Sequence, residues 1–127
     1  MIVVGYSANQ YGDAALEHAI AEATLRSTSL LVVNSSKGDA LVDATFAPEE
    51  RVESVEALLD KCGVEYELVQ PIGVTVTDAL LDAMRRDDAE LLVIGIRHRT
   101  AVGKFLLGSN AQQLIMNCPK PILAVKP

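Results

Sequence analysis

The chain has 127 residues, of which 50% are apolar and only 4% aromatic. This length allows one domain, residues 1–127, with an aliphatic core, and is too short for two. The net charge of −6 argues against a protein that binds duplex nucleic acid, because neutralising phosphates needs a broad basic face.

Targeting signals are not evident. The sequence starts with a strand-like run, Ile2-Val3-Val4. It shows neither the basic segment nor the long apolar core of a signal peptide. No apolar run approaches the ~18–20 residues that a membrane span needs. Cys62 and Cys118 lie in unrelated contexts and form no disulfide framework or metal motif. We therefore expect a cytoplasmic protein without a membrane partner.

Strands and helices are predicted to alternate. Short apolar runs predict five strands, at 2–6, 30–34, 64–69, 91–95 and 122–125. Apolar residues at helical spacing predict four helices, at 13–24, 48–62, 75–86 and 109–116. Pro48 suits the first turn of the second helix, Gly63 its C-terminal end, and Thr75 the N-terminus of the third. Strict alternation predicts a doubly wound α/β fold, a parallel sheet with helices on both faces.

Ligands of such sheets bind beyond the carboxyl ends of the strands, where the strand order reverses. Alternation alone leaves open which strands meet at that point. If the first and fourth strands are neighbours, the loop at 7–12 and the loop at 95–108 form one crevice.

The second of these loops is basic. Residues 1–90 hold 6 basic and 17 acidic residues, a net charge of −11, whereas residues 91–127 hold five basic residues and no acidic one. Arg97, Arg99 and Lys104 lie in this loop, and Gly108-Ser109-Asn110 begins the next helix. A helix N-terminus beside cations binds anions through its free N–H groups and its dipole. The alternative is a solvated basic loop, with Ser109 acting only as a helix cap.

Several common motifs are excluded. Gly103-Lys104 is followed by Phe105, so the P-loop pattern is not met. The loop after Gly5 has no glycine until Gly12, which excludes the dinucleotide fingerprint. His18 and His98 have no partners at metal-ligand spacing, so no metal site is expected.

From Gly95 to Asn110 the sequence resembles the universal stress proteins. Their ATP-binding members carry G-x2-G-x9-G-[ST] after the fourth strand. Gly95 and Gly108-Ser109 reproduce that spacing, with His98 in place of the second glycine. The resemblance extends over the whole chain, including Cys-Pro-Lys-Pro-Ile-Leu-Ala-Val near its end.

This resemblance implies a Rossmann-like fold of the adenine nucleotide α-hydrolase type, with five parallel strands in the order 3-2-1-4-5 and four helices. It implies an adenine nucleotide, such as ATP, with or without Mg²⁺. Ser7 stands where the family usually has an aspartate. The implied nucleotide-binding residues are Gly5, Ser7, Ser35, Ile94, Gly95, Arg97, His98, Arg99, Gly108, Ser109 and Asn110. Of these, Ile94 and Gly95 would border the ribose, and Ser35 would lie near the adenine edge.

Two functions from different classes follow. The first is a stress-response sensor or adaptor whose state depends on an adenine nucleotide. The second is a nucleotide-independent interaction module, favoured by the departures at Ser7 and His98. Neither a positioned general base nor a nucleophile–base pair is evident, so we expect at most a slow ATPase. The family commonly dimerises through its last strand, here Ile122 to Val125, which implies a homodimer.

Overall fold

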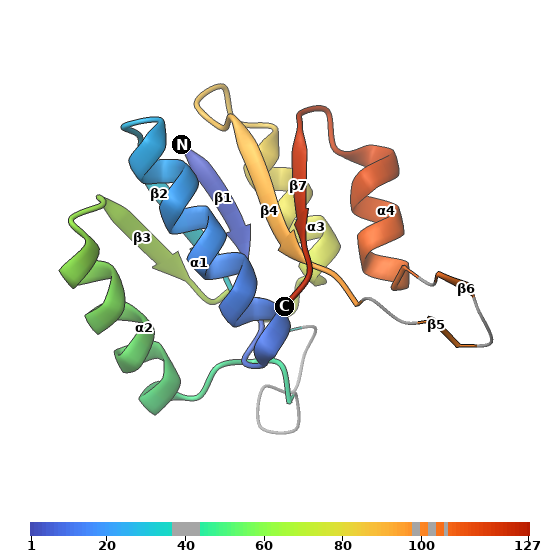
Figure 1. Cartoon of the computed structure of the whole chain (residues 1–127), viewed down its shortest axis with the longest axis horizontal. Coiled ribbons are helices and arrows are strands. Elements are labelled where there is room, and N and C mark those ends of the chain that lie inside the picture. The colour runs from blue at the N-terminus through green and yellow to red at the C-terminus, as the bar shows by residue number, and fades with distance from the viewer. Residues whose placement is uncertain (37–43, 98–99, 102–103, 106) are drawn as a thin grey trace.

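A computed structural model describes residues 1–36, 44–97, 100–101, 104–105 and 107–127 (Figure 1). Five strands form one parallel sheet in the order β3-β2-β1-β4-β7, which confirms the order 3-2-1-4-5. The strands are β1 (Ile2–Gly5), β2 (Leu30–Val33), β3 (Tyr66–Val69), β4 (Leu91–Gly95) and β7 (Ile122–Val125). The chain proceeds outward from β1 to β3 and then crosses to β4, so the order reverses between β1 and β4.

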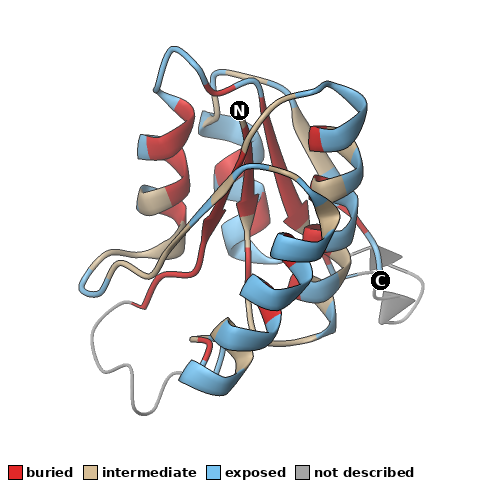
Figure 2. Ribbon diagram, turned by 90° about the vertical axis from the view of Figure 1, so that its left-hand side faces the viewer, coloured by how far each residue is buried: buried red, intermediate tan, exposed pale blue. Residues whose placement is uncertain are grey.

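Helices cover both faces of the sheet, because alternate side chains of each strand point to opposite faces. Ile2 and Val4 pack against α1 (Gln10–Leu25) and α2 (Glu49–Cys62). Val3 lies in the other core cluster, with α3 (Val76–Met84) and α4 (Ser109–Asn117). Figure 2 shows the strands as a buried layer between helices with exposed outer faces.

Helix ends differ from the prediction at α1. The sequence predicted a loop at 7–12 and a helix from residue 13, but α1 begins at Gln10. Asn9 is its N-cap, and the Asn9 Oδ1 atom accepts hydrogen bonds from the N–H groups of Tyr11 and Gly12, both at 3.1 Å. The apolar spacing starts later than the helix, since the first turn is placed by this cap.

The other predicted helix ends lie within two residues of the observed ones. Thr75 caps α3, its hydroxyl accepting from the Asp78 N–H at 3.2 Å. Gly63 ends α2 in the left-handed conformation, with φ of 73°. Pro48, predicted as the first helical residue, is instead the N-cap of α2. Its fixed φ suits both positions, which explains the difference of one residue.

A small antiparallel pair was not predicted. β5 (Thr100–Ala101) pairs with β6 (Lys104–Phe105) within the basic loop after β4. Two-residue strands are too short to show an alternating pattern, so the sequence carries no signal for them. In the part of the chain that is described, no helix is long and apolar enough to span a bilayer.

Candidate functional site

A cavity of about 390 Å³ lies at the carboxyl ends of the strands, where the strand order reverses. The pairing of β1 with β4 brings together the two loops that the sequence predicted to form one crevice. The predicted site residues that line this cavity are Gly5, Ser7, Ser35, Ile94, Gly95, Arg97, Gly108, Ser109 and Asn110. The other two, His98 and Arg99, lie outside the described residues.

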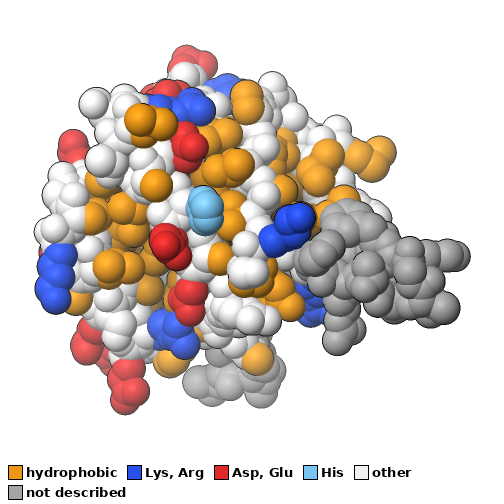
Figure 3. Space-filling view, viewed as in Figure 1, with side chains coloured by type: hydrophobic (Ala, Val, Ile, Leu, Met, Phe, Trp, Pro, Cys, Tyr) orange, Lys and Arg blue, Asp and Glu red, His pale blue; other side chains and the backbone are white. Residues whose placement is uncertain are grey.

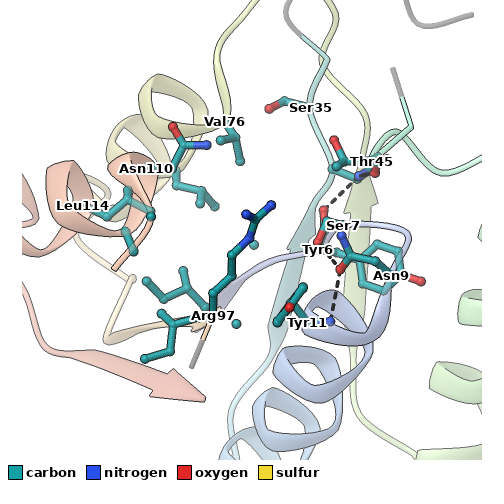
Figure 4. A pocket seen from close by; sticks show the side chains of 18 of the residues that line it. Tyr6, Ser7, Asn9, Tyr11, Ser35, Thr45, Val76, Arg97, Asn110 and Leu114 are labelled. Carbon is teal, nitrogen blue, oxygen red and sulfur yellow. Dashed lines mark hydrogen bonds between the residues drawn. The ribbon is translucent and has the colours of Figure 1, made fainter. Parts of the chain in front are cut away.

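Each side of the cavity comes from a different strand end. Ser7 follows β1 in the centre, Ser35 follows β2 on one side, and Arg97 follows β4 on the other. Figure 4 shows the Arg97 side chain extending into the space between Asn110 of α4 and the segment from Tyr6 to Asn9.

Three helices begin at this cavity, and their first turns differ: α3 is capped by Thr75, whose hydroxyl accepts from the Asp78 N–H. The side chain of Asn9 caps the N-terminus of α1 by accepting hydrogen bonds from its first N–H groups. The N-cap of α4 is Gly108, with φ of −63° and ψ of 156°, and no side chain of the described residues caps that helix. Ser109, considered above as a cap, is instead the first helical residue. The first N–H groups of a helix lack partners within the helix, so the start of α4 can accept an anion.

The charge at this end of the cavity is positive. Arg97 is exposed and forms no ion pair with any carboxylate of the described residues. The described residues that line the cavity include no Asp or Glu. A guanidinium beside a free helix N-terminus favours a phosphate or carboxylate group.

Gly95 has a packing role that the sequence did not reveal. A Cβ atom at Gly95 would lie 2.2 Å from the Tyr11 carbonyl oxygen, and one at Gly12 would lie 1.8 Å from the Ser7 carbonyl oxygen. These two glycines let the first turn of α1 approach the ends of β1 and β4. By contrast, a Cβ atom at Gly108 would meet no described atom within 4 Å.

The wall beyond β2 is organised by Asn34, a buried residue that the sequence analysis missed. Its Nδ2 group donates to the carbonyl oxygens of Tyr6 (2.8 Å) and Thr45 (3.0 Å). Its Oδ1 atom accepts from the Ala47 N–H (2.7 Å) and from Gln70 Nε2 (3.0 Å). One amide therefore holds the segment around Thr45 against the cavity. The signal that could have identified Asn34 is an amide side chain at the end of an apolar run.

Ser35 and Ser36 follow Asn34 and are buried, with 7% and 1% of their surfaces exposed. Among the residues that the structure describes, neither hydroxyl has a hydrogen-bond partner. Ser35 lines the cavity, between Val76 and Thr45 in Figure 4, whereas Ser36 does not line it. A buried hydroxyl without a partner costs free energy, so a ligand that bonds to Ser35 would recover it.

Beside the cavity, Ser7 and Tyr6 are engaged in local contacts. The Ser7 hydroxyl donates to Asn9 Oδ1 at 2.8 Å. Tyr6 OH donates to Asp13 Oδ1 at 3.0 Å, and Arg51 bonds to both. Burial, and then the bond to Asp13, raise the pKa of Tyr6. Neutral Tyr6 is thus favoured in the folded state, and the associated stability is lost as pH rises through the raised pKa.

An apolar floor closes the cavity beneath these polar groups. Its residues come from α3, from α4 and from the position after β4, and were not predicted: Val76, Leu80, Ile96, Ala111 and Leu114. The sequence marks Leu80, Ala111 and Leu114 only as positions on buried helix faces, and the packing of α3 beside α4 places them here. A cavity with an apolar floor and a few polar groups at its edge suits a small organic anion.

Within the described residues, no three His, Cys, Asp or Glu side chains could jointly hold a metal ion.

The fold and the cavity define a class: doubly wound α/β proteins that hold small ligands where the strand order reverses. Residues 1–126 match the universal stress protein family. A universal stress protein from Mycolicibacterium smegmatis is 61% identical, over 100% of this chain and 98% of that protein. The chain therefore belongs to the universal stress protein family.

Solved structures agree with this assignment. A universal stress protein from Archaeoglobus fulgidus superposes with a TM-score of 0.80 at 29% identity, covering 98% of this chain and 97% of that one. A structure of the universal stress protein from Archaeoglobus fulgidus in complex with dAMP gives a TM-score of 0.75 at 27% identity, covering 98% of this chain and 96% of that one.

The two glycines at the cavity should respond differently to alanine. Gly95→Ala forces a Cβ atom against the Tyr11 backbone and should lower the free energy of unfolding by about 2–3 kcal/mol. Gly108→Ala meets open space and should cost less than about 1 kcal/mol, as expected for a change at an N-cap. Urea denaturation followed by circular dichroism measures both. Equal losses would show that the contact of Gly95 with α1 is not a packing constraint.

Proposed function

We propose that this protein binds an adenine nucleotide in the cavity at the β1–β4 reversal and acts as a nucleotide-dependent sensor or adaptor in a stress response. The phosphate lies at the start of α4, beside Arg97, and the base lies toward Ser35. The observation that carries the proposal is that the N-terminus of α4 and Arg97 line one cavity, and that within the described residues the first has no side-chain cap and the second no ion pair.

The energetics support an anion at this end. The start of a helix carries roughly half a positive charge, and charge-assisted hydrogen bonds contribute about 1.5–3 kcal/mol each. Arg97 and the N–H groups of Ser109 and Asn110 supply such bonds to one phosphate. The predicted residues His98 and Arg99 belong to the same proposed phosphate site.

The form of the nucleotide follows from the charges. ATP or another adenine nucleotide is expected, with or without Mg²⁺. Mg²⁺ is usually held by one or two carboxylates together with phosphates. The described lining offers no carboxylate, and Asp39 and Asp43 lie outside the described residues. The complex of the Archaeoglobus protein with dAMP supports an adenine nucleotide as the ligand class.

We also propose a homodimer that forms through β7, with one domain in each subunit. We place it in the cytoplasm, where Cys62 and Cys118, both free thiols, would stay reduced. β7 pairs with β4 and, among the described strands, with no other. Ala124 is exposed and Leu123 partly exposed on it. Figure 3 shows apolar side chains gathered between α1 and β7. An open apolar edge favours pairing with a second copy.

One observation favours the second candidate, a dimeric interaction module that needs no nucleotide. Ser7 replaces the aspartate usual at this position, and its hydroxyl already donates to Asn9. A nucleotide would therefore lack the contact that a free carboxylate offers its sugar or base. The two candidates differ in whether the cavity binds any nucleotide at all.

Gly108→Asp should separate binding from folding. An Asp at this N-cap supplies the acceptor that α4 lacks, so stability should stay unchanged or rise by up to about 1 kcal/mol. The same carboxylate occupies the phosphate position, so affinity for AMP and ATP should fall by about 100-fold or more. Calorimetric titration, with and without Mg²⁺, measures the affinity.

Two variants complete this test. Pro48→Asp makes the same charge change at the uncapped start of α2, away from the cavity, and should leave affinity unchanged. Arg97→Ala should weaken AMP while sparing adenosine, which has no phosphate. If the wild type binds no adenine nucleotide, the interaction module is the correct function.

The dimer can be tested at the exposed Ala124. Ala124→Lys places two like charges near each other across a two-fold β7 contact, so sedimentation velocity should show a shift from dimer to monomer. Leu25→Lys, at a residue 80% exposed on α1, is the matched control and should stay dimeric. A monomeric wild type would contradict the proposed assembly.

A further inference from the structure

We propose that a groove between α1 and α2 binds a basic amphipathic helix of a partner protein. The groove has a volume of about 530 Å³ and is lined by side chains of both helices. Of the described residues, Tyr6 alone lines both this groove and the cavity at the β1–β4 reversal. The groove is therefore a second site, and the inference goes beyond the proposed nucleotide binding and does not depend on it.

The floor of the groove is apolar. It is formed by Leu16 and Ile20 of α1 and by Val55, Leu58 and Cys62 of α2. Leu16 and Val55 are buried, whereas Ile20 is partly exposed and Leu58 has 49% of its surface exposed. Figure 3 shows apolar side chains gathered between α1 and α2. An exposed leucine that continues a buried apolar floor favours contact with an apolar partner.

The groove is elongated along the two helices. Its lining residues recur at intervals of three or four positions on each helix, so they form one stripe on α1 and one on α2. The stripe on α2 extends from Arg51 to Cys62, about 16 Å at 1.5 Å per residue. This length matches about three turns of a helix lying in the groove. Such a helix contacts the floor with apolar residues at i, i+3, i+4 and i+7.

The charge at the groove is negative. Together α1 and α2 hold eight acidic and two basic residues, a net charge of 2 − 8 = −6. Of the two basic residues, Arg51 lines the groove, but it is paired with Asp13 at 3.2 Å. Glu17 also lines the groove, is exposed, and has no ion pair within the described residues. Lysine or arginine at the edge of a docked helix would complement this charge.

The same charges argue against two other occupants. An anionic segment would be repelled by Glu17 and by the net charge of the two helices. A second copy that docked groove to groove across a two-fold axis would bring these like charges together. A helix with one apolar face and cationic flanks satisfies both the floor and the charge, so it is the occupant that the groove fits best.

The test is a calorimetric titration of the whole protein with a synthetic peptide. The peptide has about 14 residues, or four helical turns, with leucine at i, i+3, i+4 and i+7 and lysine elsewhere. One control peptide has glutamate in place of each lysine, and another has the same composition in an order without helical period. We expect the lysine peptide to bind at least about tenfold more tightly than either control.

Variants of the protein locate the bound peptide. Leu58→Gln should weaken the lysine peptide by about tenfold or more, whereas Leu25→Gln, at an exposed leucine of α1 outside the groove, should not. Glu17→Lys should weaken it by about 3- to 10-fold. Glu56→Lys makes the same charge change on α2 outside the groove, so screening should limit its effect to about twofold. All four residues are exposed, so the variants should remain folded.

Three results would overturn this inference while the proposed nucleotide site stands. The first is a lysine peptide that does not bind, or binds no better than the glutamate peptide. The second is an affinity that Leu58→Gln weakens no more than Leu25→Gln does. The third is a change in the sedimentation coefficient of the protein alone in Leu58→Gln, which would show that a second copy occupies the groove.

Discussion

The pairing of β1 with β4 is the constraint on which the rest of the structure depends. It places the carboxyl ends of β2, β1 and β4 side by side and opens a cavity that no single loop could form. Gly12 and Gly95 belong to the same constraint, because α1 can begin beside both strands only where these residues lack a Cβ atom. The position of the cavity is thus a consequence of sheet order and of two close backbone contacts.

The chemical character of the cavity comes from a contrast between helix starts. Asn9 caps α1 and Thr75 caps α3, whereas α4 begins at a glycine and, among the described residues, has no side-chain cap. Of these three starts, the one beside Arg97 therefore favours an anion most. The wider charge distribution agrees with this choice, since residues 1–90 carry a net charge of −11 and residues 91–127 a net charge of +5. Such an asymmetry favours the approach of an anion from the basic end.

Strict alternation of apolar strands and helices predicted the α/β class because it permits few topologies. The strand order came from the resemblance to the universal stress proteins. The residues proposed at the strand ends and at the start of α4 line one cavity. Gly108-Ser109 and the acid-free segment carry local signals, whereas Ser7 and Ser35 came from the family resemblance. Sequence reasoning could not find the apolar floor, because Leu80 and Leu114 are indistinguishable from core positions until α3 and α4 are packed. Nor could it assign Gly95 to packing, because the contact with Tyr11 joins residues far apart in the chain. The start of α1 was misplaced since a cap, and not an apolar repeat, determines it.

A crystal structure of the protein with AMP would test the central claim most directly. We expect the phosphate oxygens within hydrogen-bonding distance of the Ser109 and Asn110 N–H groups and of the Arg97 guanidinium. A phosphate bound elsewhere, with the start of α4 and Arg97 in contact only with solvent, would contradict it.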